Sequence, residues 1–152
     1  MKILGLDPGT ATTGFAVVEK VNGELQAIDF GAITTRAKTS LDSRLVEIAD
    51  NLSELIVLHE PDLVAIESLF FFKNQKTAFA VAQARGAVLL TVARYKLPIV
   101  ELTPLQVKQA VTGYGRADKK QIQQMVKEIY GLDKIPKPDD AADALAIAFA
   151  AS

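Results

Sequence analysis

The stretch ILGLDPG, residues 3–9, decides the fold. Its first four residues predict a short buried strand, and Asp7 follows where that strand ends. The run LVAIE, residues 63–67, has the same form and ends in Glu67. A carboxylate against apolar neighbours is costly unless it is hydrogen-bonded, protonated or bound to a cation. Two buried strands that each end in an acid therefore predict a shared site at one edge of a sheet.

A second pair of acids opens an apolar helical segment, DAADALAI, at residues 140–147. Asp140 and Asp143 are three residues apart, so they share one face of the predicted helix. Turns and helix caps explain many single acids, but a cap does not explain Asp143 or Glu67. Asp139 competes with Asp140, because a spacing of four residues to Asp143 also shares the face. We predict that Asp139 is the N-cap and that Asp140 belongs to the site.

Four carboxylates at close range cannot all stay ionised without a cation. The chain has no cysteine and one histidine, and oxygen ligands alone favour Mg²⁺ or Mn²⁺. Two such ions, about 3.5–4 Å apart, would activate a water and stabilise the leaving 3′-oxygen in phosphodiester cleavage. We therefore predict two Mg²⁺ ions per site, replaceable by Mn²⁺, with the four ligands Asp7, Glu67, Asp140 and Asp143.

The composition predicts one ordinary globular domain over residues 1–152, with 49% hydrophobic and 23% charged residues. The absence of cysteine excludes disulfide frameworks, thiolate metal sites and cysteine nucleophiles. No signal peptide is evident, and no apolar stretch reaches the length of a membrane span. We expect a cytoplasmic protein with no membrane partner.

The charges are unevenly distributed along the chain. Residues 1–68 hold 5 basic and 11 acidic residues, whereas residues 69–138 hold 12 basic and 4 acidic ones. A basic segment beside an acidic cluster is suited to bringing a polyanionic substrate to a metal site, although a solvated basic face explains the count equally well.

Hydrophobic periodicity predicts five strands and five helices. The strands cover residues 2–8, 13–20, 24–34, 62–67 and 98–102, and the helices begin near residues 41, 74, 104, 119 and 140. The order βββαβαβααα predicts an α/β fold of the ribonuclease H-like kind, a mixed five-stranded sheet flanked by helices on both faces. The helix over residues 74–95 is apolar nearly all round, which indicates burial on a second side, and we predict that side to be a dimer interface.

The motifs together resemble RuvC-type Holliday junction resolvases over essentially the whole chain. The matching pieces are LGLDPGT at 4–10 with Thr13-Gly14, AIE at 65–67 with Phe70 and Lys73-Asn74, AQARG at 82–86, QVKQ at 106–109 and DAADALA at 140–146. The resemblance implies a homodimeric endodeoxyribonuclease that resolves four-way junctions by paired symmetric nicks in recombination and DNA repair. It also implies products with 5′-phosphate ends and a branch-migration helicase complex as a partner.

The resemblance also assigns roles to residues. The family's catalytic carboxylates correspond to the four predicted metal ligands, and Lys108 and Lys119 correspond to lysines near the scissile phosphate. Phe70 corresponds to an aromatic residue that faces unstacked bases at the junction. Arg85 remains open between a phosphate ligand and an interface ion pair. The predicted DNA-binding residues are Phe70, Lys73, Lys76, Arg85, Lys108, Arg116, Lys119 and Lys120.

Three alternatives compete with a junction-resolving enzyme. Another ribonuclease H-like enzyme, such as a ribosomal-RNA processing nuclease, would use the same metal site to cut different nucleic-acid strands. An actin-like ATPase or sugar kinase also opens with Asp-x-Gly-Thr after its first strand, but it needs two related domains and a much longer chain. A junction-binding protein without catalysis would not require four acids.

Overall fold

The computed structural model describes residues 1–68 and 75–152. The predicted order of elements is confirmed, with a five-stranded sheet arranged β3-β2-β1-β4-β5. The strands are β1 (Lys2–Asp7), β2 (Thr12–Val21), β3 (Glu24–Thr34), β4 (Leu63–Glu67) and β5 (Ile99–Leu102). The first three strands are antiparallel to one another, whereas β4 and β5 run parallel to β1, so the sheet is mixed as expected.

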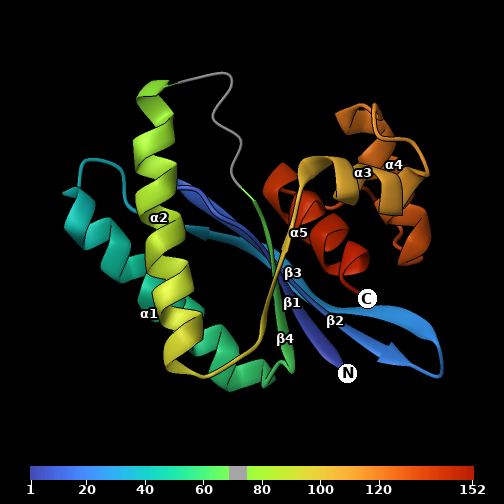
Figure 1. The fold of residues 1–152 in the computed structure, drawn as a ribbon, viewed down its shortest axis with the longest axis horizontal. Coiled ribbons are helices and arrows are strands. Elements are labelled where there is room, and N and C mark those ends of the chain that lie inside the picture. The colour runs from blue at the N-terminus through green and yellow to red at the C-terminus, as the bar shows by residue number, and fades with distance from the viewer. Residues whose placement is uncertain (69–74) are drawn as a thin grey trace.

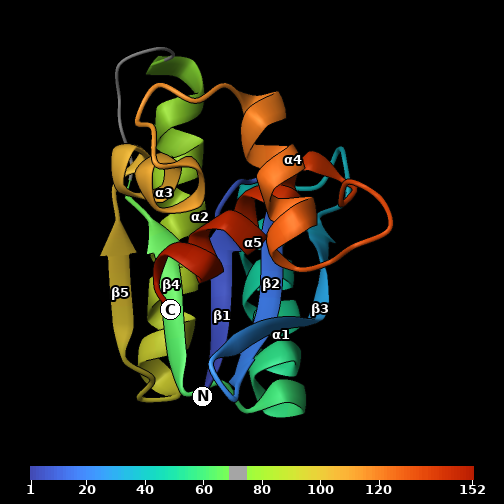
Figure 2. The ribbon, with the colours of Figure 1, turned by 90° about the vertical axis from the view of Figure 1, so that its right-hand side faces the viewer.

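Helices cover both faces of this sheet (Figure 1). One face carries α1 (Leu41–His59) and α2 (Gln75–Arg94), and the other carries α3 (Pro104–Thr112), α4 (Lys119–Ile129) and α5 (Asp139–Ala150). Figure 2 looks onto the second face, where α5 crosses the central strands with α3 and α4 beside it. Across residues 1–68 and 75–152, no helix combines the length and the apolar character needed to span a membrane.

The side chains of β1 alternate between two separate cores. Leu4 and Leu6 are fully buried against α1 and α2, whereas Ile3 packs into the core around α5. Because side chains along a strand point to alternate faces, Asp7 lies on the same face as Ile3. The first acid of the predicted site therefore projects from the end of β1 toward α5.

Strands β1 and β4 are parallel neighbours, and Leu6 pairs with Ile66. Asp7 and Glu67 each follow one residue later, so both acids leave the sheet at one edge. This confirms the arrangement of strands on which the predicted site depends.

Two glycines let α5 lie directly on the sheet. A Cβ atom added at Gly5 would overlap the Ala144 carbonyl oxygen, and one at Gly14 would overlap the Asp140 carbonyl oxygen. Any side chain at these two positions would lift the helix away from β1 and β2. The close approach brings the first turn of α5, with its acids, to the edge where Asp7 lies.

One predicted helix cap is wrong. The N-cap of α5 is Pro138, and Asp139 is already the first helical residue. The Asp139 carboxylate turns instead to Lys137, whose Nζ donates a hydrogen bond of 3.0 Å to it. By contrast, Thr103 and Asp118 are the N-caps of α3 and α4, and each forms a reciprocal capping box.

Candidate functional site

The structure brings together the three segments predicted to share a site. Asp7 ends β1, Glu67 ends β4, and Asp140 and Asp143 lie in the first two turns of α5. Burial raises the pKa of Asp7 to about 7, and the charges of the other three acids, Asp143, Glu67 and Asp140, add to the rise. The other three carboxylates thus all act on Asp7 electrostatically.

The same two causes act on two other acids of the cluster. Burial raises the pKa of Glu67, the charge of Asp143 raises it further, and Lys108 opposes both. Burial also raises the pKa of Asp143 above its ordinary value, although Lys119 opposes the rise. Such a site holds more negative charge than its surroundings stabilise, which is the condition that a bound cation relieves.

Lys119 supplies positive charge to the cluster from the first turn of α4. Its Nζ lies 3.5 Å from Asp143 Oδ2 and 3.7 Å from Asp139 Oδ2. Burial alone would lower the pKa of Lys119, but these carboxylates outweigh it and the pKa is raised. The neighbouring Lys120 is exposed and lines a hollow on α4. Geometry therefore separates the two adjacent lysines, and Lys119 is the one beside the acids.

Geometry also distinguishes Asp140 from Asp139. The charge of Asp140 contributes to the raised pKa of Asp7. Asp139 instead forms ion pairs with Lys137 and Lys119, and its pKa is lowered, first by the Lys137 hydrogen bond. Of the two acids, only Asp140 acts on Asp7, whereas both raise the pKa of Asp143.

The donor set fits a hard divalent cation. Its four members are carboxylates, and three of them have raised pKa values that a cation would lower. As they stand, no three His, Cys, Asp or Glu side chains within residues 1–68 and 75–152 converge on a common metal position.

The predicted DNA-binding residues divide into three groups. Lys108 acts on Glu67, while the side chains of Arg116 and Lys120 are exposed. Arg85 is engaged within the chain, where it donates to the Glu67 carbonyl oxygen and pairs with Glu101. Phe70, Lys73 and the side chain of Lys76 lie outside the described part of the chain.

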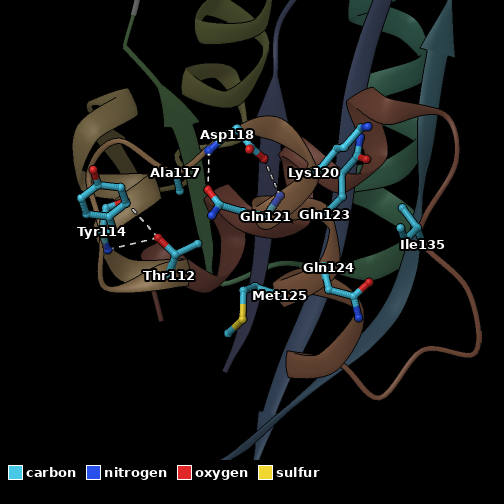
Figure 3. A pocket seen from close by; sticks show the side chains of 10 residues that line it. All are labelled: Thr112, Tyr114, Ala117, Asp118, Lys120, Gln121, Gln123, Gln124, Met125 and Ile135. Carbon is cyan, nitrogen blue, oxygen red and sulfur yellow. Dashed lines mark hydrogen bonds between the residues drawn. The ribbon is translucent and has the colours of Figure 1, made fainter.

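A hollow of about 770 Å³ lies over α4 and the loop before it (Figure 3). Tyr114 stands at one end of the hollow and Ile135 at the other, with Gln121 and Gln124 between them. A hydrogen bond from the Tyr114 N–H to Thr112 Oγ1 holds the loop. The sequence did not predict this hollow, because α4 and the segment before α5 meet only in the folded chain.

An open mixed sheet with acids at the ends of two neighbouring parallel strands and at the start of the crossing helix defines a ribonuclease H-like nuclease. A family model described as crossover junction endodeoxyribonuclease RuvC matches residues 3–151, and the chain belongs to this family. It is 54% identical to crossover junction endodeoxyribonuclease RuvC of Caldicellulosiruptor saccharolyticus over 97% of this chain and 90% of the relative.

Solved structures give the same result. The chain is similar to Thermus thermophilus RuvC in complex with Holliday junction substrate, with a TM-score of 0.92 and 34% identity over 99% of this chain and 92% of that one. It also shares its fold with the yeast mitochondrial Holliday junction resolvase, with a TM-score of 0.66 at 13% identity. The predicted family and fold are thereby confirmed.

Proposed function

We propose that this chain resolves four-way DNA junctions by paired symmetric nicks, in recombination and DNA repair. The observation that carries the proposal is the cluster at the sheet edge, where burial and then the charges of acids from β4 and α5 raise the pKa of Asp7 to about 7. Membership of a junction-endonuclease family supplies the substrate class. The proposed enzyme is a single domain over residues 1–152.

Asp7, Glu67, Asp140 and Asp143 are the proposed ligands of Mg²⁺, with two ions per site and Mn²⁺ as a substitute. Bound metal supplies an activated water and charge stabilisation for the leaving 3′-oxygen, which leaves 5′-phosphate ends. Lys119 and Lys108 act on the phosphate from the protein side. A lysine beside a reacting phosphate neutralises the negative charge that develops on it. Lys119 lies beside Asp143, and Lys108 acts on Glu67. Both observations support a role for these lysines at the phosphate.

The proposed DNA surface continues from the cluster onto α4. Lys119, Lys120 and the exposed Arg116 lie at the start of this helix and in the loop before it. Phosphate contacts from such residues hold a duplex in register without reading its sequence. Phe70 and Lys73, which precede α2, and Lys76, in its first turn, are proposed to contact the junction.

A second copy of the chain is the proposed partner of α2. Its outer face carries an exposed stripe in which Phe79 is 79% and Leu90 is 55% exposed. Gln83 and Gly86 lie between these two residues on the same helical face. Paired nicks need two sites related by a two-fold axis, and an isologous interface on this stripe would provide them.

Gly86 supports the proposed interface because nothing in the described part of the chain requires a glycine there. Apart from its own helix backbone and sequence neighbours, no atom of residues 1–68 and 75–152 lies within 4 Å of the position that its Cβ would occupy, and the residue is within α2 rather than at its end. Glycine inside an exposed helix costs about 1 kcal/mol relative to alanine. Close approach of a partner helix to the Gly86 backbone explains this cost.

Family resemblance further supports a branch-migration helicase complex as a partner and a cytoplasmic location. Neither bears on the chemistry proposed for the acid cluster.

The test of the proposed function is cleavage of three matched substrates: a mobile four-way junction, a linear duplex of the same sequence and an RNA–DNA hybrid. We expect Mg²⁺ to support symmetric nicking of the junction, with ligatable 5′-phosphate ends, and EDTA to abolish it. Preferential cleavage of the hybrid would overturn the proposal, as would equal cutting of junction and duplex.

A further inference from the structure

Arg85 is a nearly buried cation whose partners lie at the ends of two strands. Its side chain is 11% exposed, and its Nη1 donates a hydrogen bond of 2.8 Å to the Glu67 carbonyl oxygen. Its Nη2 lies 2.5 Å from Glu101 Oε2. A buried guanidinium that is paired and hydrogen-bonded in this way is costly to remove, because the groups around it lose their partner.

The peptide group between Glu67 and Ser68 is held from both sides. Arg85, on α2, donates to the Glu67 carbonyl oxygen. The Ser68 N–H donates to the Leu102 carbonyl oxygen at 2.7 Å. Leu102 follows Glu101 in β5, so Arg85 and the Ser68 N–H both bind to neighbouring residues of the same strand. Because a peptide group is planar, holding both of its polar atoms restricts its rotation. The direction of the Glu67 side chain is restricted with it.

This restraint acts at the end of β4, where pairing with β1 has ended and Glu67 pairs only with Leu102 of β5. The pairing of β1 with β4 ends at Leu6 and Ile66, one residue before Glu67. Strand β4 also ends at Glu67. On the side of β1, therefore, the ladder does not extend to the residue that carries the acid. Arg85 reaches this strand end from the opposite layer, since α2 packs on the face away from α5.

We infer that Arg85 is a positioning residue, which sets the Glu67 carboxylate in the acid cluster through the Glu67 main chain. The inference rests on the proposed function of Glu67 as a metal ligand. It differs from the role of phosphate ligand considered for Arg85, because two of the guanidinium nitrogens are engaged within the chain. Residues that orient a metal ligand typically change metal affinity or activity by roughly 10- to 100-fold when they are replaced.

The test compares Arg85→Met with Arg94→Met, a change at an exposed arginine on the same helix. Three quantities are measured: the single-turnover cleavage rate at saturating enzyme, junction affinity without metal, and Mn²⁺ binding to the DNA-free protein by calorimetry. For Arg85→Met we expect the rate and the Mn²⁺ affinity to fall, each by roughly 10- to 100-fold, with junction affinity unchanged. Arg94→Met should match the unsubstituted protein in rate and Mn²⁺ affinity.

Weaker junction binding with unchanged Mn²⁺ affinity would overturn the inference and make Arg85 a phosphate ligand. If Arg85→Met does not fold, Arg85→Lys takes its place, since one ammonium group keeps the charge but cannot span both acceptors. Cleavage and Mn²⁺ binding at the original level in Arg85→Lys would also overturn the inference. If the unsubstituted protein cuts no junction, the proposed function fails, while the Mn²⁺ titration still tests Arg85.

Discussion

The Nζ of Lys119 lies 3.5 Å from Asp143 Oδ2, so a lysine ammonium holds the place beside the acids that a metal ion would share. Asp143 is half-buried and its pKa is raised by burial, which makes a counter-charge favourable there. The contact joins α4 to α5 across the candidate site. It makes Lys119 a counter-ion for the free carboxylates, and the proposed function adds a second role, as a cation beside a bound phosphate.

We predict that Lys119→Met slows cleavage much more than it weakens junction binding. Removal of one group that stabilises charge in a transition state typically costs about 10²- to 10³-fold in rate. The matched control is Lys120→Met, which removes the same charge from the next residue on the exposed side of α4. Single-turnover rates and junction affinities of both variants check the prediction. Equal rate losses in the two variants would contradict a specific role for Lys119.

Asp7→Asn is expected to abolish cutting while leaving junction binding largely intact at ordinary Mg²⁺ concentration. The amide keeps the size of the side chain but lacks the charge that a divalent cation requires. Because Asp7 is the acid on which the other three charges act together, its loss should remove the site rather than weaken it. Gel-shift and nicking assays on one junction measure both effects. Loss of binding in this variant would show that Asp7 is structural.

Much of this fold could be predicted because its signals are local. The apolar runs that end in Asp7 and Glu67 define two strands, and turn and cap residues define where the other elements begin. The capping boxes at Thr103 and Asp118 could be predicted for the same reason, since each depends on four successive residues.

The features that could not be predicted depend on contacts between distant segments. The role of Gly14 follows from the path of α5 across β2, which no local pattern reveals. Arg85 was left undecided because its partners, Glu67 and Glu101, lie on two other elements. The predicted cap at Asp139 was wrong because Lys137 attracts its carboxylate and the helix begins one residue earlier than expected.

The metal-free protein is expected to lose stability as the pH rises from about 4 to about 7. The pKa of Asp7 is raised from 3.8 to about 7, so the folded state binds its proton more tightly than the unfolded state does. Stability therefore falls with rising pH in this window, since the unfolded state then binds fewer protons. The effect of Asp7 is at most about 4 kcal/mol, because one pKa unit corresponds to about 1.4 kcal/mol.

Urea unfolding in EDTA at pH 5 and at pH 8 measures this dependence. Asp7→Asn should reduce the difference between the two pH values, and it should raise stability at pH 8. Added Mg²⁺ should stabilise the unsubstituted protein at pH 8 but not the variant, because a ligand that binds only the folded state shifts unfolding. An identical pH dependence in both proteins would show that Asp7 does not carry the raised pKa.

The stripe on α2 provides two substitutions with opposite expectations for the monomer. Phe79→Asp places a charge at an exposed apolar position, so it should separate the proposed dimer with little effect on the fold of one chain. Gly86→Ala should stabilise an isolated chain by up to about 1 kcal/mol through helix propensity. In a dimer whose helices meet at Gly86, the added methyl group should instead weaken association.

Sedimentation with and without junction DNA, combined with thermal unfolding, distinguishes these effects. We expect Phe79→Asp to be monomeric and to lose paired nicking while the acid cluster still binds Mn²⁺. Val57→Asp, at an exposed apolar position of α1, is the matched control and should leave association unchanged. If the unsubstituted protein sediments only as a monomer under both conditions, α2 is not a dimer interface, and the cost of Gly86 needs another explanation.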